Sequence, residues 1–351
     1  MKKLTLFLAF ITVTQVNAAT ISVGPGDSIQ AAISSANNGD VISLAAGTYR
    51  ESFSFNGKAI TLQGSGKDTI LRGSSFKSAI IFNQNEGHDS IVENMSFQRG
   101  LRAGAILIDG AAPTIRQCWF FKNKSIGAGS AIFVFGTNDS NQSAVIQNNV
   151  FYKNQTRSVK PGNIAHAVYV DDSSPTINNN TFISNDRSGV YVRGSSAPLI
   201  TSNIFAYQGK GKAKERKKID NFGERETRGR AVFIENLQGS ANVQITYNIS
   251  FGHRTADVHV QGEDFSFTTL QESPVSFVTT NNNLIVDPLF SGVRFNKKRT
   301  NVKRLFDAGL SASSPAINAG NPDAAFNDTD ASRNDIGATG GSTPFTFTNL
   351  Q

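Results

Sequence analysis

Three charged residues end similar apolar segments of this sequence, and their types suit acid–base chemistry. Asp171, Arg193 and Glu235 each follow a run of small, β-branched and aromatic residues. Cleavage of a uronic-acid polysaccharide by β-elimination needs a cation that neutralises the uronate carboxylate and a base that takes the C5 proton. We therefore predict Arg193 as the catalytic cation, with Asp171 or Glu235 as its partner or as a calcium ligand. The structural alternative is an ion pair between neighbouring strands, worth about 0–1 kcal/mol.

Aromatic side chains are predicted to lie beside this charged row. Successive residues of a strand point to opposite faces, so Tyr169, Tyr191 and Phe233 point outward if their valine and isoleucine neighbours point inward. Exposed rings are costly to leave in water. A sugar chain stacked across them, or a cover formed by the basic insertion, the C-terminal segment or another subunit, would remove that cost. The residues that we predict to contact a substrate are Tyr169, Tyr191, Phe233, Asp109 and His166.

Acidic and amide side chains also gather near the end of the chain. Seven Asn or Asp residues fall between positions 321 and 335, among them Asp328, Asp330 and Asp335. Hard oxygen ligands at this density suit Ca²⁺, so we predict these three carboxylates as its ligands. The spacing is not that of an EF-hand loop, since Ala331 stands where that loop has its glycine. An Asx-rich turn that closes the fold is the structural alternative.

A repeated pair of segments is expected to position these residues. Each repeat has a short apolar run, a polar turn and a second run that ends on Phe in most copies. The Ile of the second run recurs at intervals of 31, 31, 23 and 45 residues. Columns of identical residues arise when each coil lies on the previous one at the inter-strand distance of about 4.8 Å. The columns hold Ile115, Ile146, Ile177, Ile200 and Ile245; Phe97, Phe120, Phe151, Phe182 and Phe205; and Asn149, Asn180, Asn203 and Asn248, with Cys118 in the place of an Asn.

This pattern predicts an all-β fold, a single-stranded right-handed parallel β-helix with a short N-terminal capping helix. Asp27 or Ser28 is expected to begin the helix, and Gln30 to complete a capping box with Asp27. The predicted organisation is a signal peptide at 1–18, the β-helix at 19–338 with a basic insertion at 209–230 and an Asx-rich closing segment at 311–341, and a tail at 342–351.

The first residues bear on the location of the protein. Lys2 and Lys3, an apolar run over 4–13 and small residues before position 19 are typical of a secretory signal peptide. No later stretch of the 351 residues is long and apolar enough for a membrane helix. We therefore expect a protein that is secreted, periplasmic or held at the cell surface. Its single Cys allows no internal disulfide.

Two segments carry most of the positive charge. In a chain of net charge +7, residues 209–230 have nine Lys or Arg against four Asp or Glu, and residues 294–304 have six basic residues and no acidic one. They form either solvated loops or a surface that attracts a polyanion, such as an acidic polysaccharide or a lipopolysaccharide surface. Nucleic acid is not an expected partner, because the sequence has no recognisable module for it. The oligomeric state is left open.

Several stretches resemble known β-helix proteins. The entry region is similar to that of the pectin-lyase-like β-helix superfamily, and the closing segment resembles that of exported bacterial β-helix proteins. The resemblance covers most of the chain after residue 18. It implies the fold, while the superfamily includes lyases, hydrolases, esterases, epimerases and non-catalytic surface proteins. The stretches that carry it are 27–32, 39–44, 47–51, 60–64 and 69–73 at the start, and 283–290, 314–320 and 333–338 at the end.

The sequence lacks the catalytic motifs of polygalacturonases, of pectin methylesterases and of the main pectate lyase family. Our leading hypothesis is an exported β-helix protein that binds an acidic polysaccharide or envelope glycan and cleaves it as a lyase. The first alternative is a non-catalytic envelope protein for adhesion or scaffolding. The second alternative is a uronan epimerase, which would use the same face and leave the chain length unchanged.

Overall fold

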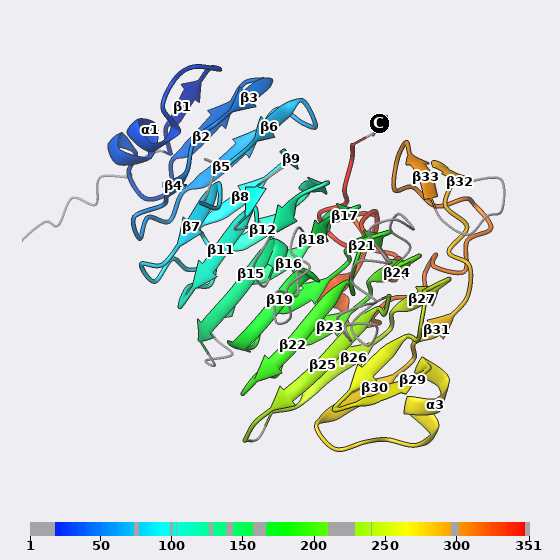
Figure 1. Ribbon diagram of the computed structural model, residues 1–351. Coiled ribbons are helices and arrows are strands. Elements are labelled where there is room, and N and C mark those ends of the chain that lie inside the picture. Colours follow the sequence, from blue (N-terminus) through cyan, green and yellow to red (C-terminus); the bar gives the residue numbers. More distant parts are fainter. Residues whose placement is uncertain are drawn as a thin grey trace, which may run out of the picture.

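The computed structural model describes residues 18–73, 77–98, 101–102, 104–125, 129–137, 143–156, 166–209, 229–239, 241–295 and 302–347. The predicted signal peptide, apart from its last residue, and most of the predicted basic insertion lie outside these residues. None of the helices described is long and apolar enough to cross a membrane. Short strands stack along one axis, from β1 at one end to β30 near the other (Figure 1).

Three sheets run along this stack, and most coils contribute one strand to each of them. Sheet 1 consists of β1 (Thr20–Val23), β2 (Val41–Leu44), β5 (Thr61–Gly64), β8 (Ile91–Glu93), β12 (Thr114–Arg116), β16 (Val145–Gln147), β20 (Thr176–Asn178), β23 (Leu199–Thr201), β26 (Val243–Thr246) and β30 (Val278–Asn281). Sheet 2 consists of β3 (Gly47–Tyr49), β6 (Thr69–Leu71), β9 (Ser96–Gln98), β13 (Trp119–Phe121), β17 (Val150–Tyr152), β21 (Thr181–Ile183), β24 (Ile204–Ala206), β27 (Ile249–Phe251) and β31 (Leu284–Ile285). Sheet 3 consists of β4 (Phe53–Ser54), β7 (Ile80–Phe82), β11 (Ile106–Asp109), β15 (Gly129–Thr137), β19 (His166–Ser173), β22 (Val190–Gly194), β25 (Val232–Leu237), β28 (Val258–Val260) and β29 (Glu263–Phe265).

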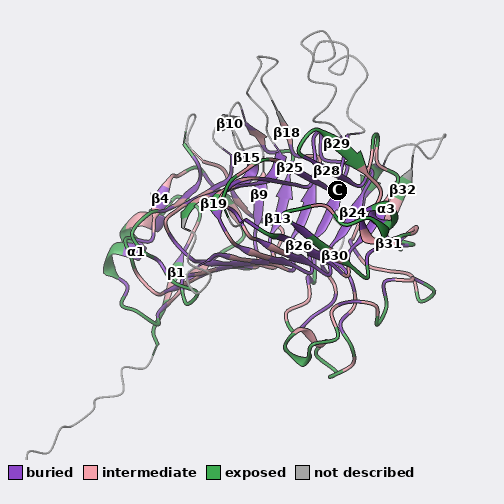
Figure 2. Ribbon diagram, turned by 90° about the horizontal axis from the view of Figure 1, so that it is seen from below, coloured by how far each residue is buried: buried purple, intermediate pink, exposed green. Residues whose placement is uncertain are grey.

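Neighbouring strands of the three sheets are parallel, except that β29 returns antiparallel to β28. A smaller sheet joins β10 (Leu101–Arg102), β14 (Lys124–Ser125) and β18 (Gln155–Thr156). The predicted right-handed parallel β-helix is confirmed. In Figure 2 the buried residues run through the strands, and exposed residues gather in turns and at the ends.

The predicted Ile and Phe columns form the interior. Ile115 pairs with Ile146, and the pairing continues in register to Ile245. The Phe rings from Phe97 to Phe205 stack nearly parallel, with centroids 4.6–4.8 Å apart. All these side chains are fully buried. Each contributes roughly 1.5–3 kcal/mol by leaving water, so the columns favour the stacking of the coils.

The Asn column forms a ladder at the turn between sheets 1 and 2. Each amide nitrogen donates to the amide oxygen of the next coil at 3.0–3.1 Å, from Asn149 to Asn283. Each oxygen also accepts the backbone N–H of the preceding ladder residue, including that of Cys118. The residue before Asn149 has a φ of 53°, so this tight turn leaves backbone groups that only the ladder satisfies.

A second ladder follows sheet 2 and was not predicted. Asn123 bonds to Asn154, Asn154 to Asn185, and the backbone N–H of Asn185 donates to Gln208. Its intervals of 31, 31 and 23 residues match those of the Ile column. Alignment of the residues three positions after each Phe would therefore have revealed it.

Short helices close both ends of the stack. Helix α1 (Ile29–Ser35) begins at Ser28, whose hydroxyl accepts the N–H of Ala31 at 3.2 Å. The expected capping box is wrong: Glu51, from the next coil, accepts the first N–H groups of the helix, and Gln30 bonds to the backbone of Ser54. Helix α3 (Phe267–Glu272) buries Phe267 and a leucine over the last coils.

The C-terminal segment packs on the outer face of sheet 2. After β31 the chain forms the hairpin of β32 (Val293–Phe295) and β33 (Val302–Leu305), then the short helix η3 (Ala324–Phe326). Phe345 and Phe347, in the predicted tail, are buried in one cluster with Trp119 and Phe121. Figure 1 shows these orange and red segments beside β17, β21 and β24. The C-terminal segment therefore covers the outer face of sheet 2. It also reaches the turns that follow β16 and β20 of sheet 1, where Asn148 and Asn179 donate to it.

Candidate functional site

The predicted aromatic row lies on the outer face of sheet 3, and its rings are covered. Tyr169 pairs in register with Tyr191, and Tyr191 with Phe233, with ring centroids 4.6 and 5.5 Å apart. Their exposed fractions are 8%, 4% and 0%. These three rings therefore have no open face on which a sugar could stack.

His166 and Arg230 form part of that cover. The His166 ring lies 4.7 Å from Tyr191 and 5.7 Å from Phe233, and the Arg230 guanidinium lies 5.2 Å from the Phe233 ring. Burial, followed by the charges of Arg187 and Arg230, holds the pKa of His166 well below its ordinary value. His166 is thus a neutral, fully buried imidazole, placed to pack against the tyrosine rather than to meet a substrate.

The structure brings Asp171 and Arg193 together and leaves them at the surface. They are register partners on β19 and β22, with Arg193 Nε 3.2 Å from Asp171 Oδ1 and exposed fractions of 41% and 24%. Burial raises the pKa of Asp171 against the opposing effect of Arg193. A hydrogen bond with Tyr169 raises the pKa of Arg193. The guanidinium of Arg193 therefore already interacts with two residues of its own chain.

Glu235 does not join that pair. A register shift after Val192 pairs Gly194 with Leu237, so Arg193 has no register partner on β25. The remaining predicted contact, Asp109, ends β11 opposite Phe135, further down the sheet.

Glu235 belongs to a chain of polar groups at the last coil. Its Oε1 lies 3.1 Å from His259 Nε2, His259 Nδ1 lies 2.8 Å from Asp264, and Arg230 donates to both oxygens of Asp264 at 2.6 and 2.7 Å. Burial alone would raise the pKa of Asp264, but its hydrogen bonds with Arg230 and His259 outweigh burial and lower the pKa. This network fastens β29 onto β28. No repeat spacing links its members, so the sequence did not reveal it.

The carboxylates predicted to bind calcium accept hydrogen bonds within the closing segment. Asp328 accepts the backbone N–H groups of Asp335 and Gly341, and Asp330 accepts the N–H and hydroxyl of Ser332. Asp335 itself accepts the N–H of Asn318 at 2.7 Å. In the described part of the chain, no group of three or more His, Cys, Asp or Glu could hold a metal ion. The three carboxylates fix turns here, and calcium stays a prediction.

A basic surface lies where the hairpin β32–β33 meets sheet 2, and we define it by five residues: Lys122, Lys153, Arg294, Lys303 and Arg304. Lys122 and Lys153 each lie over the aromatic ring of the preceding residue, 4.4 and 4.6 Å from its centroid. Lys153 Nζ donates to the backbone oxygen of Lys303 at 3.0 Å, which ties the hairpin to the sheet. Arg294 and Arg304 are register partners, and Lys303 is exposed beside them.

The sequence predicted only the part of this basic surface that lies on the hairpin. The hairpin lies in the predicted basic segment 294–304, of which residues 296–301 fall outside the described residues. Lys122 and Lys153 are 31 residues apart, the same interval as the Ile column. That interval predicts that the two lysines stack on successive coils. The packing of the C-terminal segment against them could not be read from a repeat.

Comparison with known proteins gives the family. The family model described as "Periplasmic copper-binding protein (NosD)" matches residues 32–249, more than half of the chain. The chain therefore belongs to the NosD family of parallel β-helix proteins. No curated protein matches the sequence.

The solved structures to which the chain is similar include polysaccharide lyases. An alginate lyase from a Paenibacillus species shares 17% identity at a TM-score of 0.42, with 76% of this chain and 95% of that chain covered. The pectate lyase Pel9A shares 16% identity at a TM-score of 0.38, with coverage of 92% and 97%. Similarities at this level do not indicate what this chain acts on.

The residues described here do not fit a copper site. Copper in proteins is held by imidazole, thiolate and thioether groups. Cys118 and Met95 are fully buried in the core, and burial raises the pKa of Cys118 far above its ordinary value. His88 is bonded to the backbone oxygen of Ser143, and His259 lies between two carboxylates. No cluster of three His, Cys, Asp or Glu suited to a metal occurs within the described ranges, so we derive no chemistry through copper.

Proposed function

We propose that this chain is an exported protein that binds an acidic polysaccharide of the cell envelope without cleaving it. The observation that carries the proposal is the basic surface of Lys122, Lys153, Arg294, Lys303 and Arg304. Five cations on one side of the stack create a positive potential that attracts a polyanion and weakens with salt. Two of the lysines repeat from coil to coil, about 4.8 Å apart, so a chain with regularly spaced carboxylates could meet them in succession.

The charged row on the outer face of sheet 3 does not favour the binding of a polyanion there. Asp171, Asp172 and Glu235 outnumber Arg193 there, and Arg193 is already paired. A polyanion would be repelled by this acidic row. The covered rings of Tyr169 and Tyr191 remove the stacking platform as well.

Cleavage by β-elimination is the second candidate. It is favoured by the contact of Arg193 with both Asp171 and Tyr169, which places a cation beside two groups able to exchange a proton. A lyase would need Arg193 to leave Asp171 when the uronate arrives. An epimerase would need the same step.

Charge reversal on the hairpin tests the proposal. The variant K303E/R304E changes the surface by four charges, and the control K67E/K77E makes the same change on the first coils. Each Lys or Arg near an anionic surface contributes about 1 kcal/mol, so two reversals are expected to weaken binding to polygalacturonate or alginate by at least about tenfold. The control should bind within about twofold of the original protein. Equal affinity of both double variants would refute the assignment of the surface.

A further inference from the structure

An amide-lined groove lies between the outer face of sheet 1 and the closing segment. It is lined by Gln147, Asn148, Thr176, Asn178, Asn179 and Phe326, among others. The strands β16 and β20 supply the floor, and η3 with the segment around Gly341 supplies one wall. We propose that this groove binds one neutral sugar unit of a glycan.

One buried group in the groove has an unused hydrogen-bonding atom. Asn178 is 6% exposed, and its Oδ1 has no hydrogen-bond partner, while its Nδ2 donates to Asn179 at 3.3 Å. Buried polar groups are almost always paired, and an unpaired one needs an explanation. A sugar hydroxyl both donates and accepts, so it matches this amide in either orientation. This unpaired acceptor is the observation from which we infer a ligand hydroxyl.

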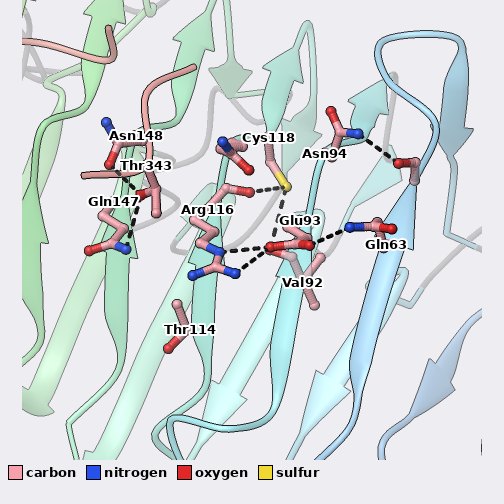
Figure 3. A network of polar contacts seen from close by, with 12 residues as sticks. Gln63, Val92, Glu93, Asn94, Thr114, Arg116, Cys118, Gln147, Asn148 and Thr343 are labelled. Carbon is pink, nitrogen blue, oxygen red and sulfur yellow. Dashed lines mark hydrogen bonds and ion pairs between the residues drawn. The ribbon is translucent and has the colours of Figure 1, made fainter. Parts of the chain in front are cut away.

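The other amides of the groove are held in place by the closing segment. Asn148 donates to the backbone oxygens of Ala338 and Gly340, and Asn179 donates to Asn334 and to the backbone of Asp335. Figure 3 shows Gln147 and Asn148 directed at Thr343, with hydrogen bonds of 3.3 and 2.9 Å. Side chains fixed in this way lose little freedom on binding. The groove is thus pre-organised, apart from the acceptor of Asn178.

The chemistry of the lining selects an uncharged ligand. The side chains named above are amides, one hydroxyl and the half-buried ring of Phe326, which can pack against the C–H face of a sugar. Arg116, the register partner of Gln147, is engaged with Glu93 at 2.6–2.7 Å (Figure 3). The groove has a volume of about 100 Å³, below the roughly 300–1,000 Å³ of sites that enclose a drug-sized ligand. This size restricts the ligand to a single sugar unit, part of which stays outside the groove.

The groove is independent of the basic surface. Gln147 lies in the groove beside the closing segment, whereas Lys153 lies on the basic surface beside the hairpin β32–β33. A heteropolysaccharide could use both, but a neutral monosaccharide can test the groove alone. Failure of one proposal therefore leaves the other intact.

Ligand-observed NMR and calorimetry with glucose, galactose, mannose and N-acetylglucosamine test the groove. We expect the full chain to bind at least one of these sugars, and Asn178→Leu to weaken that binding by about tenfold or more. Phe326→Ala changes the wall of the groove and should weaken the binding of the same sugar. Gln244→Leu, an exposed amide on the same sheet, is the matched control and should bind normally.

A stability measurement separates a binding role from a structural one. Asn178→Leu removes an unpaired acceptor, so its Tm should equal or exceed that of the original chain. The proposal is overturned if no neutral sugar in the panel binds, or if both groove variants bind as tightly as Gln244→Leu. A large fall in Tm for Asn178→Leu would assign the amide to folding and also overturn it.

Discussion

Replacement of Asn180 by Ala should destabilise the protein strongly, because this side chain connects three coils. Its Oδ1 accepts the backbone N–H and the amide of Asn149 at 3.0 and 3.1 Å. Its Nδ2 donates to the backbone oxygens of Ile146 and Asn178 and to Asn203. All of these atoms are buried, so water cannot replace the amide.

The magnitude follows from the donors left without an acceptor. Asn149 loses the partner of its backbone N–H and of one side-chain N–H, while the other side-chain N–H still donates to Ile115. Each buried unpaired group costs about 1–3 kcal/mol. We therefore expect Asn180→Ala to lower the free energy of unfolding by roughly 2–6 kcal/mol, a large share of the usual total of about 5–15 kcal/mol. Loss of the amide at this turn also weakens the interface between coils, on which a stacked repeat depends.

Urea unfolding followed by the fluorescence of Trp119 measures this loss. Trp119 is the single tryptophan and is buried in the cluster on sheet 2, so its emission should shift when that packing is lost. Asn281→Ala removes an exposed Asn on the same sheet and should change stability by less than about 0.5 kcal/mol. A loss for Asn180→Ala no larger than that of the control would refute the account of the ladder.

Two further predictions concern titratable groups. The pKa of Asp264 is lowered in the folded chain. Its contribution to stability is therefore complete above its unfolded pKa of about 3.9 and is lost as the pH falls below that value. The Tm of Asp264→Asn should fall less than that of the original chain between about pH 5 and pH 2. The thiol of Cys118 is fully buried, and burial raises its pKa. A thiol reagent at pH 8 should therefore label Cys118 only when the protein unfolds. Rapid labelling of the native protein would contradict the described core.

The sequence predicted the interior of this fold well, for a physical reason. In a stack of coils, residues at the same repeat position must lie on one another, so intervals between identical residues predict the register. That argument placed Ile146, Phe151 and Asn149 correctly, and it would also have placed Asn154 and Lys153. It needs no knowledge of contacts between distant segments.

The candidate site was predicted less well, because it depends on departures from the repeat. A bulge in β25 at Glu235 and Asn236 interrupts the regular pairing of Glu235 with Arg193. Arg230 and Asp264 meet across the last coil, and the C-terminal segment packs on sheet 2 rather than on the aromatic row. None of these features repeats along the chain. Strand alternation predicted that Tyr191 points outward, but it says nothing of what covers an outward ring.

Titration with polygalacturonate and with alginate, followed at once by binding and by the ultraviolet absorbance of unsaturated uronates, tests the proposed function most directly. The account predicts saturable binding to at least one of them that weakens as salt is added, with no rise in absorbance. An increase in absorbance would show that the protein cleaves its ligand. Absence of binding to both at low salt would contradict the role given to the basic surface.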